Sequence, residues 1–419
     1  MRVGQLAEIA SASRTDGAKI FIHGMNYAPE PLGVGRYTGE LAEFLAAQGE
    51  SVEVVTSLPH YPGWKVSAPY RPWRYSVETR NGVRIIRCPL LLHPSGRGVW
   101  RLLAPLTFAI AAAPVVIWRI LRSRPDVVIC VQPTLLSAPA AVVPAKIVGA
   151  RRILHIQDLE IDAAFDVGHL SANWLRRAAT AFERFMLRRF KRIITISNRM
   201  AEKLATKGVS SSSISILRNW VNTSKIKPMP GPNRFRKLLG LTENDFVVLY
   251  SGHIGRKQAV DRLLAAALEC RDQPSIHFVI CGDGPEKQSL IDKYGALPNV
   301  HFLPVQPEDR LCELLNFADL HALPQDRNAA DLVLPSKLGG MLASGRRILV
   351  TADPGTELYE LLGDIATIVP PGNVQLLADA IKSICITRPL AAPRLGNLLS
   401  VLSSETILPQ FRQAIISQQ

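Results

Sequence analysis

A basic turn that contains glycine follows the apolar segment Phe246–Tyr250. The turn, SGHIGRK, contains Gly252 and ends in Arg256 and Lys257. Glycines at a strand-to-helix turn let the backbone approach a ligand, and the amides of a helix N-terminus bind phosphate oxygens together with nearby cations. This turn therefore predicts a diphosphate site at which Arg256 and Lys257 neutralise negative charge.

Two more loops in the same half of the chain have a similar placement. The apolar segment Ile276–Cys281 runs into Gly282-Asp283-Gly284-Pro285, and a segment with Ser336 and Lys337 precedes another expected helix. A serine at a helix start can cap it while the free amides face phosphate or ribose. Three loops, each where a strand meets a helix, predict a nucleotide-diphosphate site on a Rossmann-like sheet.

The 419-residue chain has a formal net charge of +14, and the excess lies in its first part. Residues 1–225 hold 30 lysines and arginines against 15 aspartates and glutamates, whereas residues 226–419 hold 19 against 20. This asymmetry predicts an anionic partner for the first part, either nucleic acid or a membrane surface. Nucleic acid is disfavoured because the sequence has neither interleaved stacking aromatics nor a recognised nucleic-acid-binding module.

An uncharged segment, Leu102–Trp118, favours a membrane. Basic and aromatic residues stand at its ends, and the candidates for membrane contact are Trp100, Arg101, Trp118, Arg119 and Arg122. The segment is shorter than the roughly 20 residues that a spanning helix needs. It is typical of a monotopic surface helix or helical hairpin on the anionic inner leaflet. The alternative is an ordinary buried helix of an α/β domain.

Apolar strand-like segments alternate with helical stretches along almost the whole chain, which is the pattern of parallel βαβ units. We expect strands at Lys19–His23, Ser51–Thr56, Val83–Arg87, Val127–Val131, Arg152–Ile156, Arg192–Ile196, Phe246–Ser251, Ile276–Cys281, Val300–Leu303, Leu320–Leu323, Arg347–Val350 and Ala366–Val369. The predicted fold is α/β, with two doubly wound domains. We place a flexible tail at 1–18, the first domain at 19–225, a linker at 226–235, the second domain at 236–395, and a segment that could cross back to the first domain at 396–419.

The six cysteines are scattered, and no secretory signal precedes the first expected strand. These features predict a cytoplasmic protein without a disulfide framework or structural zinc.

The loop after the first expected strand carries Gly33 and Gly35 ahead of an expected helix, Thr38–Gln48. The two glycines allow close backbone approach, and the helix N-terminus favours an anion. Two Rossmann-like domains that face each other would place this loop opposite the diphosphate site. The alternative is a tight turn with no ligand.

Together these motifs resemble the family 4 glycosyltransferases of the GT-B fold, over roughly Lys19 to Lys382. The motifs that carry the resemblance are Gly33-Val34-Gly35, Phe182-Glu183-Arg184, Ser251–Lys257, Gly282–Pro285, Leu303-Pro304-Val305 and Val369–Asn373. The segments His155–Asp162 and Asp331–Leu338 resemble, more narrowly, bacterial exopolysaccharide and O-antigen enzymes. The resemblance implies two Rossmann-like domains facing a central cleft. It also implies retaining transfer from a UDP- or GDP-linked sugar, without metal or other cofactor, to a lipid-linked acceptor.

The resemblance assigns roles to particular residues. Arg256 and Lys257 would hold the donor diphosphate, and Gly35 would supply amides to it from the first domain. The nucleotide pocket would be lined by Gly33, Gly252, Gly282, Gly284, Val305, Ser336 and Lys337.

Two departures from the family pattern affect the site. A Glu-x7-Glu pair common in the family falls on Leu332 and Gly340, so Asp331 and Glu357 are left as candidates for ribose recognition. The usual His-Asp pair reads Gln157-Asp158 here. Asp158 is then the matched polar residue, and His155 lies two positions before Gln157, on the same face of an extended strand. We therefore take Asp158 and His155, with Arg256 and Lys257, as the candidate catalytic residues.

The alternating carboxylates of Asp158, Glu160 and Asp162 also suggest a metal site, which we disfavour because metal-dependent glycosyltransferases with such a motif have a different fold. The sequence therefore predicts a peripheral-membrane glycosyltransferase acting on a polyprenyl-diphosphate-linked saccharide in surface polysaccharide assembly. A sugar-nucleotide 2-epimerase of similar architecture and a non-catalytic nucleotide-sugar-binding subunit are the alternatives.

Overall fold

The computed structural model describes residues 17–30, 33–61, 63–93, 99–159, 173–327, 334–387 and 397–417. It forms two compact units. Unit 1 comprises residues 1–195, 201–217 and 408–419, and unit 2 comprises residues 196–200 and 218–407. The predicted tail, Asp331, Leu332, Glu160 and Asp162 lie wholly or mainly outside the described residues.

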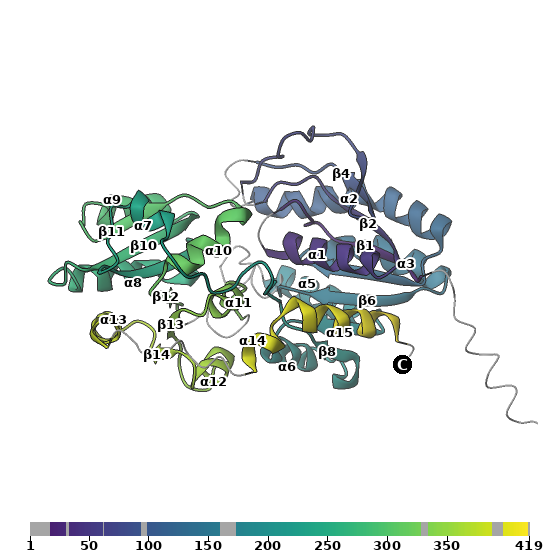
Figure 1. The fold of residues 1–419 in the computed structure, drawn as a ribbon. Helices are drawn as coiled ribbons and strands as arrows, with labels where there is room; N and C mark the ends of the chain where they lie inside the picture. The colour runs from purple at the N-terminus through teal and green to yellow at the C-terminus, as the bar shows by residue number, and fades with distance from the viewer. Residues whose placement is uncertain are drawn as a thin grey trace, which may run out of the picture. The chain divides into compact units, whose positions relative to one another are not determined.

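Unit 1 is built on an eight-stranded sheet with the order β3-β4-β2-β1-β5-β6-β7-β8 (Figure 1). The strands are β1 (Lys19–His23), β2 (Ser51–Ser57), β3 (Ser76–Arg80), β4 (Val83–Cys88), β5 (Val127–Gln132), β6 (Arg151–Ile156), β7 (Arg192–Thr195) and β8 (Ile214–Ile216). Only β3 pairs antiparallel among the described strands, with β4. Central strands such as β5 are buried along their whole length, as expected for a parallel sheet covered on both faces.

Helices connect these strands. They are α1 (Gly33–Ala47), α2 (Val99–Ser123), the 3-10 turn η2 (Leu135–Ser137), α3 (Pro139–Ile147), α5 (Asn173–Leu187) and α6 (Asn198–Thr206). Right-handed crossovers place α1, which leads from β1 to β2, on one face of the sheet. The same rule places α2 and α3, which lead to β5 and β6 on the other side of β1, on the opposite face.

The helix α2, which contains the segment Leu102–Trp118, has features of both predicted alternatives, a membrane-surface helix and a buried helix of the domain. It is one continuous helix of 25 residues, longer than the sequence indicated, and residues Leu103–Ser123 are long and apolar enough to cross a membrane by length and composition alone. However, a third of the residues in the 18-residue apolar stretch of this helix are buried in the protein. Every fourth residue from Ala104 to Ile120 is fully buried, which is the spacing of a helix that packs one face on a domain core.

Unit 2 contains a six-stranded parallel sheet with the order β11-β10-β9-β12-β13-β14. Its strands are β9 (Phe246–His253), β10 (Ile276–Asp283), β11 (Val300–Leu303), β12 (Leu320–Leu323), β13 (Arg347–Thr351) and β14 (Thr367–Val369). Its helical elements include α7 (Arg234–Leu238), η4 (Arg256–Gln258), α8 (Val260–Glu269), α9 (Lys287–Tyr294), α10 (Glu308–Phe317), α11 (Leu338–Ala343), α12 (Glu357–Leu362), α13 (Val374–Ile386) and α14 (Leu398–Val401).

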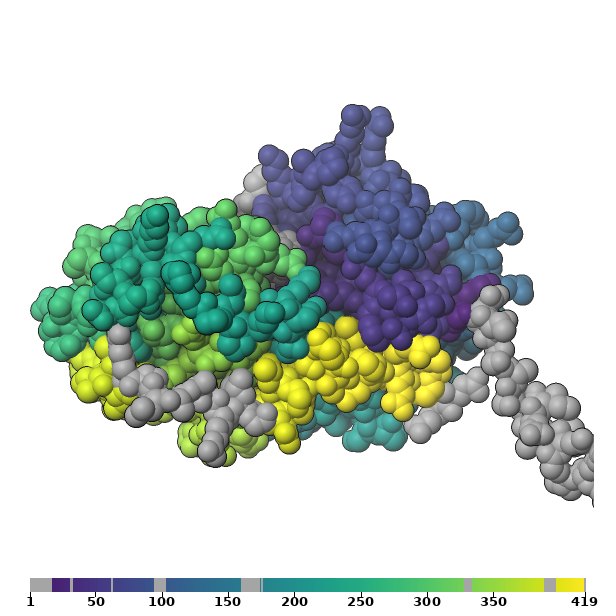
Figure 2. All heavy atoms as spheres, viewed as in Figure 1, coloured from purple at the N-terminus to yellow at the C-terminus, as the bar shows by residue number. Residues whose placement is uncertain are grey.

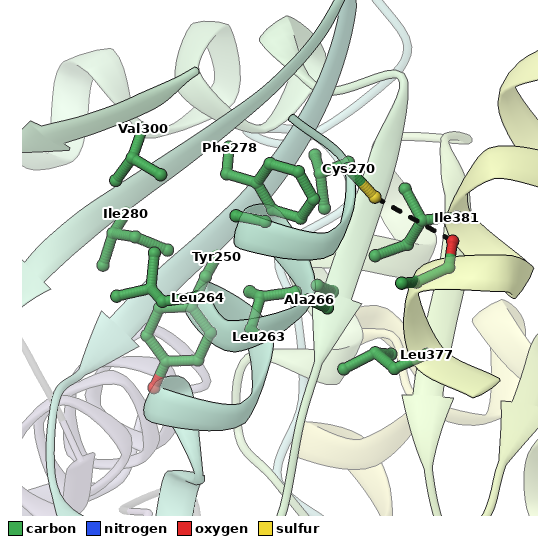
Figure 3. Close-up of a cluster of buried hydrophobic side chains, with 14 of the residues drawn as sticks. Tyr250, Leu263, Leu264, Ala266, Cys270, Phe278, Ile280, Val300, Leu377 and Ile381 are labelled. Carbon is green, nitrogen blue, oxygen red and sulfur yellow. Dashed lines mark hydrogen bonds between the residues drawn. The ribbon is translucent and has the colours of Figure 1, made fainter. Parts of the chain in front are cut away.

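A buried apolar cluster fixes β9 and β10 against α8 and α13 (Figure 3). Tyr250, Phe278 and Ile280 contribute from the strands, Leu263 and Leu264 from α8, and further residues from α13. The ring of Tyr250 belongs to this cluster, although the residue stands near the carboxyl end of its strand. The cluster therefore holds the strand ends on which the predicted glycine loops begin.

All twelve predicted strands are present, with ends that differ by at most two residues. Two strands, β3 and β8, were not predicted. Both are edge strands; β3, SVETR, is largely polar, and β8, ISI, has only three residues, so neither contains the longer apolar run that signals a buried strand.

The unit boundaries differ from the predicted domains at residues 196–200, 218–235 and 396–407, all of which belong to unit 2. The predicted linker also packs on unit 2, because Phe235 is buried and Asn316 exchanges hydrogen bonds with the backbones of Lys227 and Met229. Its prolines and glycine shape a packed segment here and do not mark a loose connection.

The C-terminal helix α15 (Ser404–Ile416) contributes its residues from Leu408 onward to unit 1 (Figure 2). Arg412 forms an ion pair of 2.6 Å with the buried Glu50, and Arg151 donates hydrogen bonds to the carbonyls of Ile416 and Ser417. Phe411 is buried among these contacts. The end of the chain is thus an integral part of the first unit.

Candidate functional site

The predicted glycine loops of unit 2 meet at the carboxyl ends of two neighbouring strands. Gly252 of β9 and Gly282 of β10 are register partners in the sheet. A Cβ atom on Gly282 would lie 1.9 Å from the carbonyl oxygen of Gly252, and one on Gly284 would lie 2.2 Å from the carbonyl oxygen of Ile254. Both positions therefore require glycine, because the two neighbouring backbones lie too close together for any side chain.

The amine of Lys337 lies beside these two strand ends. Its Nζ atom is buried, lies 3.8 Å from the centre of the Tyr250 ring, and has no hydrogen-bond partner among the described residues. A Cβ atom on Gly252 would lie 3.2 Å from the same Nζ, so glycine also makes room for the lysine. Burial lowers the pKa of Lys337 from 10.5 to about 7.

A buried amine without a partner is unfavourable in an unliganded protein and is readily satisfied by an anion. The sequence grouped Lys337 with Ser336 at a helix start, but its side chain is the more informative feature. The following helix, α11, has only six residues, and Ser336 is exposed. Lys337 is therefore the cation on which we centre the candidate site, because its amine is buried beside the glycine loops.

The two predicted diphosphate ligands lie in the short turn η4 and face solvent. The side chain of Arg256 is 91% exposed and its Nε lies 4.0 Å from a carboxylate oxygen of Glu286. Lys257 is also exposed, and its backbone carbonyl accepts a hydrogen bond from the N–H of Asp326. Val305 is exposed beyond the end of β11. These side chains can reach a ligand, but the fold does not hold them in place as it holds Lys337.

Glu357 is not available for ribose. Its carboxylate accepts hydrogen bonds from the backbone N–H groups of Asn198 at 3.0 Å and Arg199 at 3.4 Å, and it pairs with Arg218 at 2.7 Å. Arg199 in turn donates a hydrogen bond to the carbonyl of Gly355. The assignment of Glu357 to the donor site was wrong, because a buried carboxylate with three donors is a structural anchor.

In unit 1, the predicted glycine loop leads directly into α1. The helix begins at Gly33, five residues before the predicted start, so Gly33 and Gly35 form its first turn. Gly33 has a φ of +63° and nothing near its Cβ position. Gly35 requires glycine for a different reason, because a Cβ atom there would lie 2.6 Å from a carboxylate oxygen of Glu30.

Glu30, which sequence reasoning missed, organises this loop. Its side chain is buried and accepts hydrogen bonds from the backbone N–H groups of His60 and Tyr61, both at 3.1 Å, and from the Asn26 amide at 2.9 Å. Arg87, also fully buried, donates to the carbonyl of Ala28 at 2.6 Å. These contacts tie the described residues 26–30, ahead of α1, to the segments around them.

The two polar candidates predicted near the end of β6, Asp158 and His155, lie in different environments. Asp158 is exposed just beyond the carboxyl end of the strand, where ligands of such sheets bind. His155 is 1% exposed and packs edge-on against Phe411 of α15, with ring centres 5.1 Å apart. Burial lowers its pKa to about 3. The catalytic assignment of His155 was wrong, because a neutral ring sealed in the core cannot reach a substrate.

Two glutamines lie closer than His155 to the carboxyl edge of the sheet. Gln132 ends β5 and Gln157 follows β6; both side chains are buried, and the Oε1 of the first and the Nε2 of the second have no partner among the described residues. Gln157 occupies the position that the resemblance gives to histidine. Orphaned amide groups at the carboxyl edge are suited to sugar hydroxyls.

The predicted membrane residues also differ from one another. Trp118 is 60% exposed, and Arg122 is exposed near the C-terminus of α2. Arg119 is tied to Glu53 through two hydrogen bonds, so its charge is already neutralised within the unit. The side chains of Trp100 and Arg101 lie outside the described part of α2. Among the described residues, no group of three or more His, Cys, Asp or Glu side chains could hold a metal ion.

Two family models match the chain. Residues 33–220 match the Glycosyl transferase 4-like domain, and residues 233–392 match Glycosyl transferases group 1. The colanic acid biosynthesis glycosyl transferase WcaI of Escherichia coli (strain K12) is 37% identical over 404 residues, covering 94% of this chain and 98% of that protein. An alpha-galactosylglucosyldiacylglycerol synthase of Streptococcus pneumoniae is 27% identical over 146 residues, covering 32% of this chain and 38% of that protein.

Solved structures of similar fold cover nearly the whole chain. Sucrose-phosphate synthase of Thermosynechococcus elongatus has a TM-score of 0.70 at 17% identity, covering 95% of this chain and 98% of that one. Anabaena HepE, in complex with UDP and glucose, has a TM-score of 0.67 at 16% identity, covering 96% and 100%. WaaG, a glycosyltransferase involved in lipopolysaccharide biosynthesis, has a TM-score of 0.66 at 16% identity, covering 95% and 100%.

The predicted GT-B fold with two Rossmann-like domains is thus confirmed. With both family models matched and a relative 37% identical along almost its full length, the chain belongs to the family 4 glycosyltransferases of the GT-B fold.

Proposed function

We propose that this glycosyltransferase moves a sugar from a UDP- or GDP-linked donor to a polyprenyl-diphosphate-linked saccharide, with retention of configuration and without a metal ion. Its place would be the inner face of the cytoplasmic membrane, in the assembly of a colanic-acid-like exopolysaccharide or a lipopolysaccharide. The observation that carries the proposal is the buried amine of Lys337, which has no hydrogen-bond partner among the described residues and lies beside the strand ends at Gly252 and Gly282.

The donor diphosphate would complete the environment of Lys337. Its oxygens would accept hydrogen bonds from the buried ammonium, while the exposed Arg256 and Lys257 approach from the solvent side. A charge-assisted contact in a site closed to water is stronger than one in water, because the local dielectric is low. Three cations on one diphosphate would provide the charge neutralisation that a divalent metal provides in other enzymes.

The same contacts would assist the chemical step. As the bond between the anomeric carbon and the phosphate oxygen breaks, negative charge grows on the leaving diphosphate, where the cations stabilise it. An oxygen of this leaving group would accept the proton of the attacking hydroxyl on the same face of the sugar, which gives retention. Asp158, Gln132 and Gln157 at the edge of the unit 1 sheet would orient the acceptor.

Two features support a lipid-linked acceptor. The excess of positive charge lies in residues 1–225, and α2 exposes apolar side chains together with Trp118 and Arg122. An apolar surface with cationic and aromatic neighbours is suited to an anionic bilayer, from which a polyprenyl-linked substrate does not depart. WcaI is named for colanic acid biosynthesis, and WaaG is described as involved in lipopolysaccharide biosynthesis.

A transfer assay tests the proposal. The purified protein is incubated with EDTA, radiolabelled UDP- or GDP-sugars and a lipid extract that contains polyprenyl-diphosphate saccharides, and the anomeric configuration of the product is read by NMR. Label that enters the lipid fraction with retained configuration supports the proposal. Interconversion of the free nucleotide sugar would indicate an epimerase, and donor binding without turnover would indicate a non-catalytic subunit.

A further inference from the structure

An apolar groove of about 550 Å³ lies on the surface of unit 1, between α2 and the segment formed by η2 and α3. One wall carries Leu106, Ile110, Ile117 and Leu121 from α2, and the other carries Leu136, Val143 and Ile147. These walls are solvent-exposed; the side chain of Ile110 is 68% exposed and that of Ile147 is 70% exposed. A groove lined almost entirely by apolar side chains is suited to an apolar ligand.

The middle of the groove is kept open by small side chains. Ala109 and Ala113 of α2 face Ala140 of α3 among the lining residues. Among the described lining residues, Ser137 alone has a polar side chain, and its hydroxyl donates a hydrogen bond to the carbonyl of Thr134 at 2.9 Å. Water in the groove would find few partners, so its natural occupant is a hydrocarbon.

The path of the groove connects it to the candidate site. The turn η2 begins three residues after Gln132, the last residue of β5, so Leu136 lies at the carboxyl edge of the sheet. Both helices then run toward the amino edge, where Leu121 and Ile147 end the lining. The groove thus runs parallel to the strands, from the carboxyl edge of the sheet, where Gln132 and Asp158 lie, toward the amino edge.

The charges beside the groove are positive. Arg122 and Lys146, both exposed, adjoin Leu121 and Ile147 at its far end. No acidic side chain lines the described groove, so the same groove of a second copy, packed face to face with this one, would bring no carboxylate to pair with them. A chain that left the groove at this end would instead meet the phosphates of an anionic bilayer.

We propose that the groove between α2 and α3 binds the isoprenoid chain of the acceptor lipid. This inference rests on the proposed function and adds to it a binding site for a single linear hydrocarbon chain, distinct from adsorption of the helix on a membrane. A trench with raised aliphatic walls encloses a chain on several sides, and each buried methylene adds to the affinity. The acceptor would be recognised by its tail as well as by its saccharide.

The test uses a fluorescent geranylgeranyl phosphate, with geranyl phosphate and inorganic phosphate for comparison. We expect the full-length protein to bind the longer chain at least tenfold more tightly than the shorter one and to ignore inorganic phosphate. Ala113→Trp fills the groove without adding polarity and should weaken geranylgeranyl phosphate binding at least tenfold. Ala205→Trp, on an exposed position of α6 outside the groove, should leave it unchanged.

Two further measurements distinguish a blocked groove from a misfolded variant and from weaker adsorption on a bilayer. Thermal stabilisation by the nucleotide sugar shows that Ala113→Trp is folded and that the donor site is intact, so the inference can fail while the proposed function stands. Binding to vesicles of phosphatidylglycerol and phosphatidylcholine should be the same in Ala113→Trp and wild type, because the added indole keeps the surface apolar. Affinity that does not depend on chain length, or an unchanged affinity in Ala113→Trp, overturns the proposal. A dimer that Ala113→Trp dissociates overturns it too.

Discussion

The Nζ atom of Lys337 lies 3.8 Å from the centre of the Tyr250 ring and has no hydrogen-bond partner among the described residues. The ring gives the ammonium some stabilisation, yet burial still lowers the lysine pKa to about 7. The carboxyl edge of the second sheet therefore holds a cation whose charge depends on what binds there. An anionic ligand would restore the proton and the partner together.

Donor binding should therefore depend on pH. A nucleotide sugar keeps a constant diphosphate charge between pH 6.5 and 8.5, so the change comes from the protein. Above pH 7 the free Lys337 is mostly neutral, and binding must include uptake of a proton. We expect the affinity to fall by up to about tenfold per pH unit above 7, measured by isothermal titration calorimetry in buffers of different ionisation enthalpy.

The variant Lys337→Met should bind the nucleotide sugar about 10- to 100-fold more weakly at pH 7, with no proton uptake. Lys293→Met is the matched control, because Lys293 also lies over a tyrosine ring, at 4.9 Å, but is exposed. Equal pH dependence in wild type and Lys337→Met would exclude the lysine as the titrating group.

Lys337 should also lower the stability of the unliganded protein. The pKa of about 7 in the folded state is below that of the unfolded chain, so the unfolded state binds more protons between pH 7 and about 10.5. The penalty is complete below pH 7 and disappears as the pH approaches 10.5. We expect Lys337→Met to raise the free energy of unfolding by about 1–3 kcal/mol at pH 6, with a smaller gain at pH 9, in urea denaturation. A gain that grew with pH would have the wrong sign.

Because the strand ends at Gly252 and Gly282 lie so close together, Gly282→Ala should severely lower both stability and donor binding. The new Cβ atom would lie 1.9 Å from the carbonyl oxygen of Gly252, so the strand ends must separate. We expect a loss of about 3 kcal/mol or more in the free energy of unfolding and a loss of donor binding. Gly372→Ala is the control, because its φ of +88° is also unfavourable for alanine but nothing lies within 4 Å of its Cβ position. It should cost only about 1 kcal/mol.

Glu357 and Lys257 should give opposite results. Glu357→Gln weakens the ion pair with Arg218 and should lower the free energy of unfolding by about 1–3 kcal/mol while the donor affinity stays within twofold. Lys257→Ala removes an exposed side chain, so the stability should remain within about 0.5 kcal/mol while transfer falls. Thermal unfolding and a donor titration on both variants distinguish an anchor from a ligand. Normal transfer by Lys257→Ala at saturating donor would remove Lys257 from the site.

His155 should be replaceable without loss of transfer. Both of its ring nitrogens are buried without partners among the described residues, so His155→Leu removes unsatisfied polar atoms. Because burial lowers the folded pKa to about 3, wild-type stability should decrease as the pH falls from 6.5 toward 3. That part of the acid sensitivity should be absent in His155→Leu. A loss of transfer in a folded His155→Leu protein would restore its catalytic assignment.

Most of the fold could be predicted from the sequence, because buried parallel strands such as Val127–Gln132 are continuous apolar runs. The strand β3 could not, since an exposed edge strand of polar residues lacks this signal. The loops with Gly252, Gly282 and Gly284 were recognisable from glycine spacing after strands. Glycine spacing could not reveal that Gly282 is required by contact with another backbone, because such contacts arise only in the folded sheet.

The site residues were harder to predict for the same reason. The sequence marks Arg256 and Lys257 by their adjacency, whereas the burial of Lys337 over Tyr250 joins two segments far apart in the chain. Glu357 and His155 have functional residue types, and only their partners show that they are structural. Glu30 gave no signal in the sequence, because its role is to bind three donors from segments around the loop.

The most direct test of the donor site is thermal unfolding of wild type, Lys337→Met and Lys293→Met with a panel of UDP-, GDP- and dTDP-sugars, in EDTA throughout. A ligand that binds only the folded state raises the midpoint. We predict a shift with one nucleotide family for wild type and Lys293→Met, and a much smaller shift for Lys337→Met. An equal shift for Lys337→Met, or no shift with any nucleotide sugar, would contradict a metal-independent donor site centred on Lys337.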